Sequence, residues 1–350
     1  MNPFRRVLTW AVVRLGGLRV IRVIANVFEL KTGKNGHLGF PFIKRRRRHG
    51  VQILVYHRVN DEKDLIFPGI PTKAFAEQME YVAEHYTVCS LSETVQRIQS
   101  EDLPAELLTI TFDDGYRDNY ENAFPILTRL GLPATIFLAT DAIDSGRTLW
   151  HDRVFHALRE SRASALEKFG DKGQTYPLNT PAERRHALAQ VLKFLWSLED
   201  RDKCLWIERL FQELRVGDSV SREGLMLSWD DIRAMSEHRI SFGAHTVTHP
   251  ILSKIPPRRV RQEILESKEI IEANLKTPVK HFAYPVGRRE DFTDAVKKQL
   301  RDAAFDCAVT TIFGSNDSKR DLFELRRATP WDEDVDSFAL RLSYFKFVSC

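Results

Sequence analysis

The sequence predicts an α/β fold in which helices cover a set of parallel strands. Short apolar, β-branched runs alternate with amphipathic helical patterns along most of the 350 residues, as is typical of parallel sheets. The stretch at about 145–225 departs from this alternation, with helical patterns and little strand signal. We therefore expect a basic N-terminal helix and linker at 1–49, and an α/β domain at 50–350 that contains a helical insertion at about 145–225.

The composition indicates an ordinary globular protein, with 43% hydrophobic and 29% charged residues. A net charge of +4 is too small to indicate nucleic-acid binding. The cysteines are scattered and form no CxxC pair, which favours reduced, packed thiols and fits the cytosol. They are Cys89, Cys204, Cys307 and Cys350.

The N-terminal segment allows two interpretations. Val7–Phe28 is apolar but is interrupted by arginines, so no run reaches the roughly 18–20 residues that a spanning helix needs. No secretory signal peptide is evident either. Residues 1–48 could lie on an anionic membrane surface, with Lys44–Arg48 as a second cationic patch. Alternatively the helix packs on the domain, its arginines reach solvent, and Lys44–Arg48 is a solvated linker. We slightly favour peripheral membrane contact.

The domain opens with a strand that leads to a histidine. Val51–Val59 is an apolar run that contains His57 near its end. A helical pattern begins near Thr72, followed by a strand at 86–88 and a short helix at 92–98. A single histidine after a strand is more often structural than catalytic, so His57 carries no function on this pattern alone.

Two adjacent carboxylates follow the next strand. The run that begins at Leu108 ends in Asp113 and Asp114, and Gly115 lets the backbone turn. Successive side chains of a strand point to opposite faces, so the two acids can serve different purposes in one pocket. A surface Asp-Gly turn is the common alternative.

The chain then continues the alternation before the insertion begins. We expect a helix over 119–130 and a strand over 133–138. Trp150 and His151 open the insertion. They could line a sugar subsite, but we slightly favour the alternative of a packed tryptophan and a surface histidine. The helical patterns of the insertion span 152–168, 182–198 and 200–215.

A pair of histidines follows a later strand. The strand at 239–244 leads to His245, and His249 comes four residues later. Two histidines at this spacing can converge on one metal ion when the backbone is helical or tightly turned. Together with a carboxylate they make an Asp-His-His set that leaves positions open for water and substrate.

The remaining elements complete the alternation. A strand at 280–285 precedes a loop with Arg288 and Arg289, and either arginine could orient Asp113, bind an anionic part of a substrate, or simply be solvated. The other expected elements are helices at 257–275, 292–303 and 335–347, a strand at 305–310, and the segment 325–327.

Two of these motifs together resemble a known family. Thr111-Phe-Asp-Asp-Gly115 and His245-Thr-Val-Thr-His249 look like the first two motifs of the polysaccharide deacetylase (NodB-homology) family, carbohydrate esterase family 4. Tyr56-His57 resembles an N-terminal Tyr-His element of one subgroup. Phe282–Pro285 resembles the third motif, although Val286 stands where an aromatic residue is expected. The resemblance implies a distorted (β/α) barrel of the NodB-homology type.

The resemblance also implies a metal-dependent hydrolase. It assigns Asp114, His245 and His249 as ligands of a divalent ion. Zinc is the ion we expect first, with cobalt, nickel or iron as alternatives. The resemblance makes Asp113 the general base and His57 the general acid. We expect substrate contacts from Tyr116, Trp150, Tyr284, Pro285 and Arg288.

The expected reaction is removal of N-acetyl groups from an N-acetylhexosamine in a polysaccharide, oligosaccharide or lipid-linked glycan precursor. Without a recognisable export signal, we expect a cytoplasmic enzyme, peripheral to the inner membrane if residues 1–48 bind there. Two alternatives remain: an amidohydrolase on a small non-sugar amide, and a non-catalytic carbohydrate-binding protein on the same scaffold. No recognition motif accompanies Lys44–Arg48, so we expect no nucleic-acid partner.

Overall fold

The structure is a computed structural model that describes residues 50–345, except 63, 65–67, 105, 218–223 and 331. The predicted N-terminal helix and linker at 1–49 lie outside the described residues. Across the described part of the chain, no helix has both the length and the apolarity that a membrane span requires.

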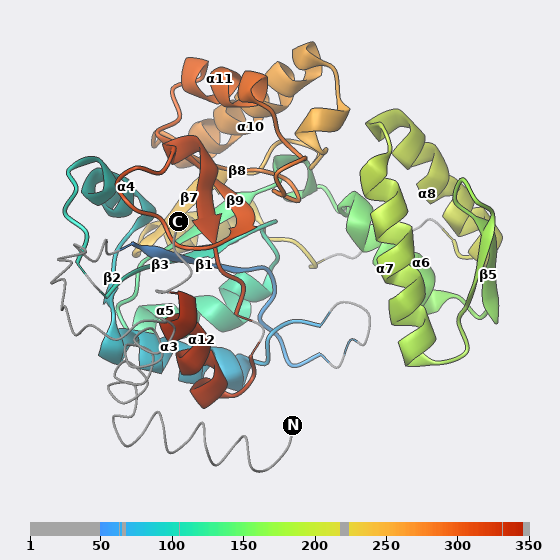
Figure 1. Cartoon of the computed structure of the whole chain (residues 1–350), viewed down its shortest axis with the longest axis horizontal. Helices are drawn as coiled ribbons and strands as arrows, with labels where there is room; N and C mark the ends of the chain where they lie inside the picture. The colour runs from blue at the N-terminus through green and yellow to red at the C-terminus, as the bar shows by residue number, and fades with distance from the viewer. Residues whose placement is uncertain are drawn as a thin grey trace, which may run out of the picture.

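Within this part of the chain, seven parallel strands form a nearly closed barrel in the order β1-β3-β4-β7-β8-β9-β10 (Figure 1). The barrel closes where Ala328, just after β10, bonds to β1: its amide donates to Ile53 O (2.8 Å) and its carbonyl accepts from Val55 N (3.0 Å). The predicted distorted (β/α) barrel is therefore confirmed. The strands are β1 Gln52–Tyr56, β3 Leu107–Phe112, β4 Ala134–Leu138, β7 Ile240–Ala244, β8 His281–Ala283, β9 Cys307–Phe313 and β10 Leu325–Arg327, and a short β2 (Thr87–Val88) pairs with β3.

The strands are apolar because both of their faces are covered. Every residue of β1, β3 and β4 is buried, with the barrel interior on one side and helices on the other, as in other parallel sheets. The surrounding helices are α3 Thr72–His85, α4 Leu91–Gln99, α5 Phe124–Arg129, α9 Trp229–Ser236, α10 Pro257–Leu275, α11 Asp294–Asp302 and α12 Val335–Phe345. Short helical turns are η1 Asn119–Ala123, η2 Thr140–Ala142, η3 Leu252–Lys254 and η4 Leu322–Glu324.

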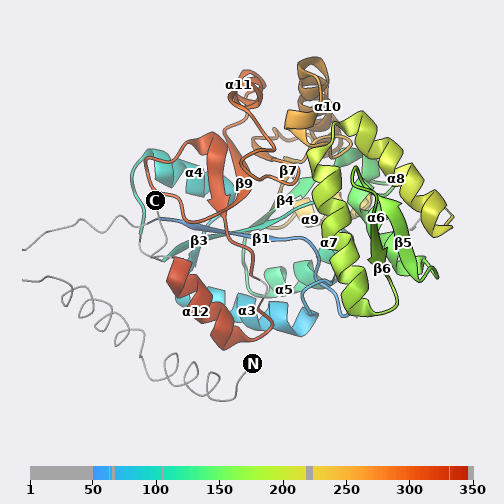
Figure 2. The ribbon, with the colours of Figure 1, turned by 45° about the vertical axis from the view of Figure 1, so that its right-hand side comes forward.

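Residues 150–214, called here the insertion, pack around a hydrophobic cluster of their own. The insertion contains α6 Trp150–Glu160, α7 Pro181–Ser197 and α8 Asp200–Leu214. The helix expected over 152–168 ends at Glu160, because Ala165–Phe169 (β5) pairs antiparallel with Gln174–Pro177 (β6). Two glycines with positive φ, Gly170 and Gly173, make the turn between these strands. Figures 1 and 2 both show the insertion, in green, beside the barrel.

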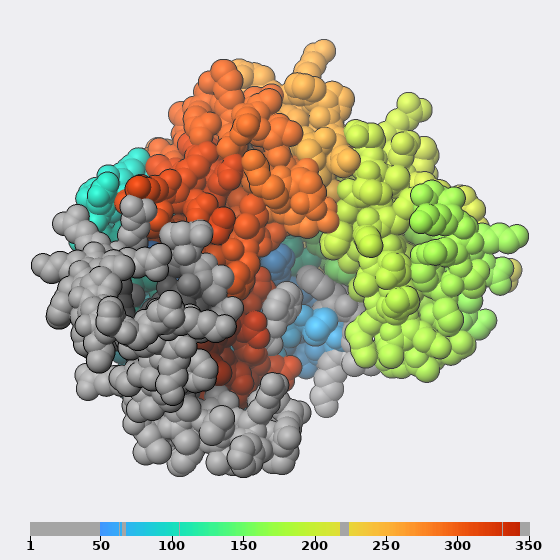
Figure 3. All heavy atoms as spheres, viewed as in Figure 1, coloured from blue at the N-terminus to red at the C-terminus, as the bar shows by residue number. Residues whose placement is uncertain are grey.

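The parallel arrangement brings the ends of distant strands together. His57 follows β1, Asp113 and Asp114 follow β3, and His245 follows β7. Because parallel strands all end at the same edge, these side chains meet at one end of the barrel, where barrel enzymes carry their active sites. In Figure 3 a hollow lies between this part of the barrel and the insertion.

Candidate active site

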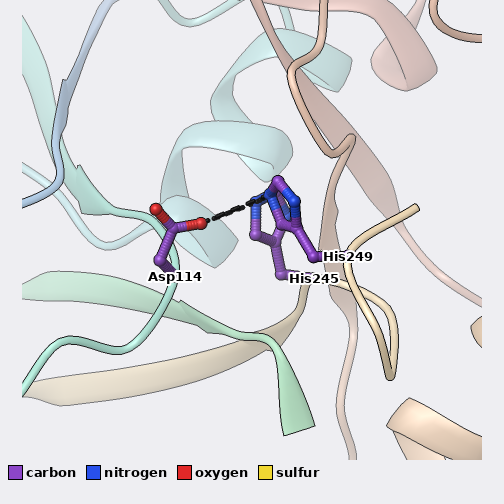
Figure 4. A group of neighbouring side chains, drawn as sticks. All are labelled: Asp114, His245 and His249. Atoms are coloured by element: carbon purple, nitrogen blue, oxygen red, sulfur yellow. Dashed lines mark hydrogen bonds and ion pairs between the residues drawn. The ribbon is translucent and has the colours of Figure 1, made fainter. Parts of the chain in front are cut away.

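Asp114, His245 and His249 converge on one buried point (Figure 4). Nε2 of each histidine lies 3.4 Å from Asp114 Oδ1, and the two Nε2 atoms are 3.1 Å apart. The three residues are only 2–4% exposed. Asp114 and His249 both have positive φ, at 75° and 56°, a conformation that costs energy for side chains other than glycine and is concentrated at functional sites.

These three residues suit a divalent cation that prefers nitrogen and oxygen ligands. Asp114 Oδ1 is buried and accepts no hydrogen bond. His245 Nδ1 lies 2.8 Å from the carbonyl oxygen of Ala283. A carbonyl only accepts, so Nδ1 carries the hydrogen and Nε2 keeps a lone pair directed at Asp114 and His249. The set therefore fits zinc, and also cobalt, nickel or iron.

The charges of this set depend on one another. Burial alone would raise the pKa of Asp114, but the surrounding histidines lower it far below its ordinary value. Burial would lower the pKa of His245, but Asp114 and Asp113 outweigh that effect and raise it. Burial and the neighbouring His245 hold the pKa of His249 well below the ordinary histidine value. Two facing imidazoles cannot both be protonated here, which favours a shared cation.

Asp113 is held by an arginine from the last strand. Arg327 Nη1 donates to Asp113 Oδ1 (2.7 Å) and Nη2 donates to Oδ2 (2.6 Å). Burial would raise the pKa of Asp113, but Arg327 outweighs it and lowers that pKa. Arg327 is itself 1% exposed, and its Nε donates to Thr310 O (2.7 Å).

Of the alternatives left open for Arg288 and Arg289, the one in which either residue orients Asp113 is wrong. Arg288 donates from Nε and Nη2 to both oxygens of Asp291 (2.9 and 2.8 Å), and Arg289 pairs with Glu324 (3.4 Å). Each arginine is occupied by an acid close to it in the fold, whereas barrel closure brings Arg327 to Asp113.

His57 lies in the same cavity as the two aspartates. Its carbonyl oxygen accepts a hydrogen bond from Asn119 Nδ2 (2.9 Å). The next residues are fixed by Asp118, which accepts from Arg58 Nε (2.9 Å) and Val59 N (3.2 Å). The loop after β1 is therefore tied to the turn after β3, which places His57 beside Asp113 and Asp114.

The cavity has a volume of about 300 Å³, and the insertion forms one of its walls. The insertion contributes Trp150, His151, Phe155, Leu192 and Trp196, and the barrel contributes Val286, Arg288 and Thr311 besides the histidines and aspartates. A larger cavity of about 690 Å³, between β5 and the end of α8, contains none of the predicted site residues.

Two of the five predicted substrate contacts, Trp150 and Arg288, line the cavity. Tyr116 does not, because it is fully buried and its hydroxyl donates to Asp152 Oδ1 (2.9 Å). Tyr284 is also buried, with its hydroxyl donating to Phe323 O (2.9 Å). Pro285 is buried and absent from the cavity lining. The substrate contacts expected of these three residues are therefore not supported.

His151 lies at the site, so the interpretation of it as a surface histidine is wrong. Its Nε2 lies 3.7 Å from Asp114 Oδ2 and 3.1 Å from the Tyr116 hydroxyl. Three other residues at the site were not predicted from the sequence. Phe155, Leu192 and Trp196 reach the cavity from α6 and α7. Their apolar helical spacing indicates burial but does not show what they face. Val286, which stands where an aromatic residue was expected, packs against the cluster of the insertion, and Trp196 supplies aromatic surface to the same cavity.

The chain is similar to known proteins over most of its length. It is 21% identical over 288 residues to YxkH of Bacillus subtilis, whose name describes it as a polysaccharide deacetylase; the match covers 82% of this chain and 73% of that protein. It is 26% identical over 125 residues to the poly-beta-1,6-N-acetyl-D-glucosamine N-deacetylase of Staphylococcus epidermidis, covering 35% of this chain and 42% of that enzyme.

Solved structures share the fold. The Streptococcus pyogenes deacetylase PplD in complex with acetate superposes with a TM-score of 0.57 at 19% identity, covering 84% of this chain and 98% of that one. IcaB from Ammonifex degensii gives a TM-score of 0.53 at 18% identity, covering 85% and 97%. The family model described as polysaccharide deacetylase matches residues 100–308. The chain therefore belongs to the polysaccharide deacetylase family.

Proposed function

We propose that this protein is a divalent-cation-dependent N-deacetylase that acts on an N-acetylhexosamine in a polysaccharide, oligosaccharide or lipid-linked glycan. One observation carries the proposal: Asp114, His245 and His249 form a buried ligand set beside a second, arginine-held carboxylate, Asp113. Membership of the polysaccharide deacetylase family supports the reaction class. The named substrate of the Staphylococcus epidermidis relative supports N-acetylglucosamine as the first sugar to test.

Asp114, His245 and His249 would hold the cation. A divalent cation held there supplies Lewis acidity, which lowers the pKa of water and polarises an amide carbonyl. Asp113 accepts the proton of the attacking water as general base. Its lowered pKa keeps it ionised at neutral pH, and the two bonds from Arg327 fix the plane of its carboxylate.

His57 donates a proton to the leaving amine as general acid. This role rests on its position in the cavity that contains Asp113 and Asp114. The hydrogen bond from Asn119 to the His57 carbonyl holds the backbone at that point, which keeps the imidazole at a constant place relative to the two acids.

The wall contributed by the insertion would receive the sugar. Aromatic rings offer a flat apolar surface for the C–H face of a pyranose, and Trp196 and Phe155 both line the cavity. The guanidinium of Arg288 lies 4.6 Å from the centre of the Trp196 ring. Because Arg288 is also bonded to Asp291, this contact holds the tryptophan ring in place.

The test is acetate release from N-acetylglucosamine oligomers and from a lipid-linked N-acetylhexosamine, using cation-loaded protein. We expect release from at least one of them, and release at least 10²-fold slower from Asp113→Asn. The preferred substrate then decides between a soluble glycan and a lipid carrier. Absence of release from both, by protein that contains one cation per chain, would contradict the sugar substrate and direct the search to small non-sugar amides.

A further inference from the structure

A buried lysine, Lys203, lies on the face of the insertion that points toward the barrel. Lys203 on α8 is 2% exposed, and its Nζ lies 2.6 Å from Asp200 Oδ1. The same Nζ lies 4.6 Å from the centre of the Trp150 ring. Burying a charged ammonium group is costly unless it is paired, so both contacts constrain Lys203, and Lys203 in turn constrains the Trp150 ring.

Trp150 connects this lysine to a residue of the proposed ligand set. Its Nε1 donates a hydrogen bond to the backbone carbonyl of His249 (3.1 Å). His249 has a φ of 56°, a left-handed conformation that surrounding contacts must maintain. A bond to the carbonyl of such a residue fixes its peptide plane, and with it the direction of the side chain.

The other side of the same loop is held by a buried acid of the barrel. Glu263 on α10 is 4% exposed. Its Oε2 accepts from the amides of Val247 and Thr248, both at 2.9 Å, and its Oε1 accepts from Thr248 Oγ1 at 2.6 Å. The turn between His245 and His249 is therefore bound to α10.

One arginine joins the two sides. Arg259 Nη1 lies 2.6 Å from Asp200 Oδ2, and Nη2 lies 3.6 Å from Glu263 Oε1. The contacts therefore form a closed ring around the loop that carries both histidines. The ring runs from His249 through Trp150, Lys203, Asp200, Arg259 and Glu263 back to Thr248.

From this ring we infer that the insertion is part of the scaffold of the metal site, with Lys203 and Asp200 as positioning residues for His249. The inference rests on the proposed function, because that assigns His249 as a ligand. Lys203 acts through Trp150 and touches neither the cation nor the substrate. The insertion thus has two tasks: it forms the sugar-facing wall, and it fixes the orientation of one ligand.

The test compares Lys203→Met with Arg209→Met, which removes another positively charged side chain from the same helix. Arg209 also lies over a tryptophan, 4.7 Å from the centre of the Trp206 indole, and it pairs with Glu213. Neither Arg209 nor these two partners belongs to the closed ring of contacts that includes Lys203. Co²⁺ affinity is measured by calorimetric titration. Amide exchange of residues 245–249 is measured in the metal-free protein.

We expect Lys203→Met to weaken Co²⁺ binding by about 10- to 100-fold, the range seen when the groups that orient a metal ligand are disturbed, and to speed exchange in 245–249. Arg209→Met should leave both unchanged, and Lys203→Arg should restore most of the affinity. If Lys203→Met does not fold, Trp150→Phe keeps an aromatic ring but removes the indole N–H that bonds to His249, and should show the same loss.

Two results would overturn the inference in distinguishable ways. Lys203→Met or Trp150→Phe could leave Co²⁺ affinity and amide exchange unchanged, even with a lower melting temperature. That result would show that the ring of contacts only attaches the insertion to the barrel and does not position His249. Failure of the unmodified protein to bind Co²⁺ would instead overturn the ligand assignment, and with it the proposed function.

Discussion

Arg327 and Asp113 form two parallel hydrogen bonds, at 2.7 and 2.6 Å, although 214 positions separate them in the chain. Both side chains are almost fully buried. The pair exists because β10 closes the barrel against β1, next to β3, the strand that Asp113 follows. It fixes the carboxylate that we propose as general base and sets the charge state in which that base works.

The first prediction concerns the pH dependence of activity. Asp113 must be ionised to accept a proton, so activity is present above its pKa and is lost as pH falls below it. Arg327 lowers that pKa, and Arg327→Lys keeps the charge but cannot make both parallel bonds. We expect kcat to fall and the acidic limb of the kcat profile to move to higher pH.

The neighbouring Arg326→Lys is the control for Arg327→Lys, and its acidic limb should stay in place. An acidic limb that is identical in Arg327→Lys and the unmodified protein would contradict the role of Asp113. Arg327→Met should be more severe, since it leaves a buried carboxylate unpaired at a cost of about 3–5 kcal/mol. The free energy of unfolding measures that loss.

The second prediction concerns the cation ligands. His245→Ala removes one of two imidazoles that face each other across 3.1 Å, so we expect it to lose its bound cation. His281→Ala removes another buried histidine, one that contacts Ser92 outside the site, and should retain the cation. Metal analysis of the purified variants checks this. An equal cation content in both variants would show that His245 is not a ligand.

The third prediction separates two histidines of the cavity. If His57 is the general acid, His57→Gln should lower kcat by about 10²- to 10⁴-fold with little change in KM. His151, which lies 3.7 Å from Asp114, is the other candidate on geometry. A large loss of kcat in His151→Gln, together with near-normal turnover in His57→Gln, would transfer the role to His151.

The fourth prediction tests the wall of the insertion. Trp196→Leu removes aromatic surface from the cavity and keeps an apolar side chain. We expect KM for the glycan to rise by about tenfold with kcat nearly constant, the pattern expected when ground state and transition state lose the same binding. Trp206→Leu is the control, because Trp206 packs on Phe169 and Phe194 inside the insertion. A KM that rises equally in both variants would argue for general loosening.

The residues that the sequence predicted best belong to short local patterns. Asp114, His245 and His249 stand directly after apolar strands or one turn later, which predicted that they meet, and the family resemblance selected Asp114 rather than Asp113 as the ligand. The barrel itself followed from the strand–helix alternation and the family resemblance. For the site residues the information lies within a few neighbouring residues, and for the barrel it lies in a pattern that repeats along the chain.

The residues that could not be predicted depend on contacts between distant segments. Arg327 reaches Asp113 only through barrel closure, and no local pattern distinguishes it from Arg288. Trp196 reaches the cavity from α7, where its ring meets the guanidinium of Arg288 from the loop after β8. Tyr116 failed as a substrate contact because the turn at Gly115, with a φ of 83°, directs the chain beneath α6. The alternation of side chains along a strand does not predict where side chains point after such a turn.

The most direct test of the central claim measures cation content and acetate release together in Asp113→Asn. In our account Asp113 is a base and not a ligand, so the variant should bind one divalent cation per chain with unchanged affinity. It should release acetate from N-acetylglucosamine oligomers at least 10²-fold more slowly than the unmodified protein. Full turnover in this variant, or loss of its cation, would contradict the account.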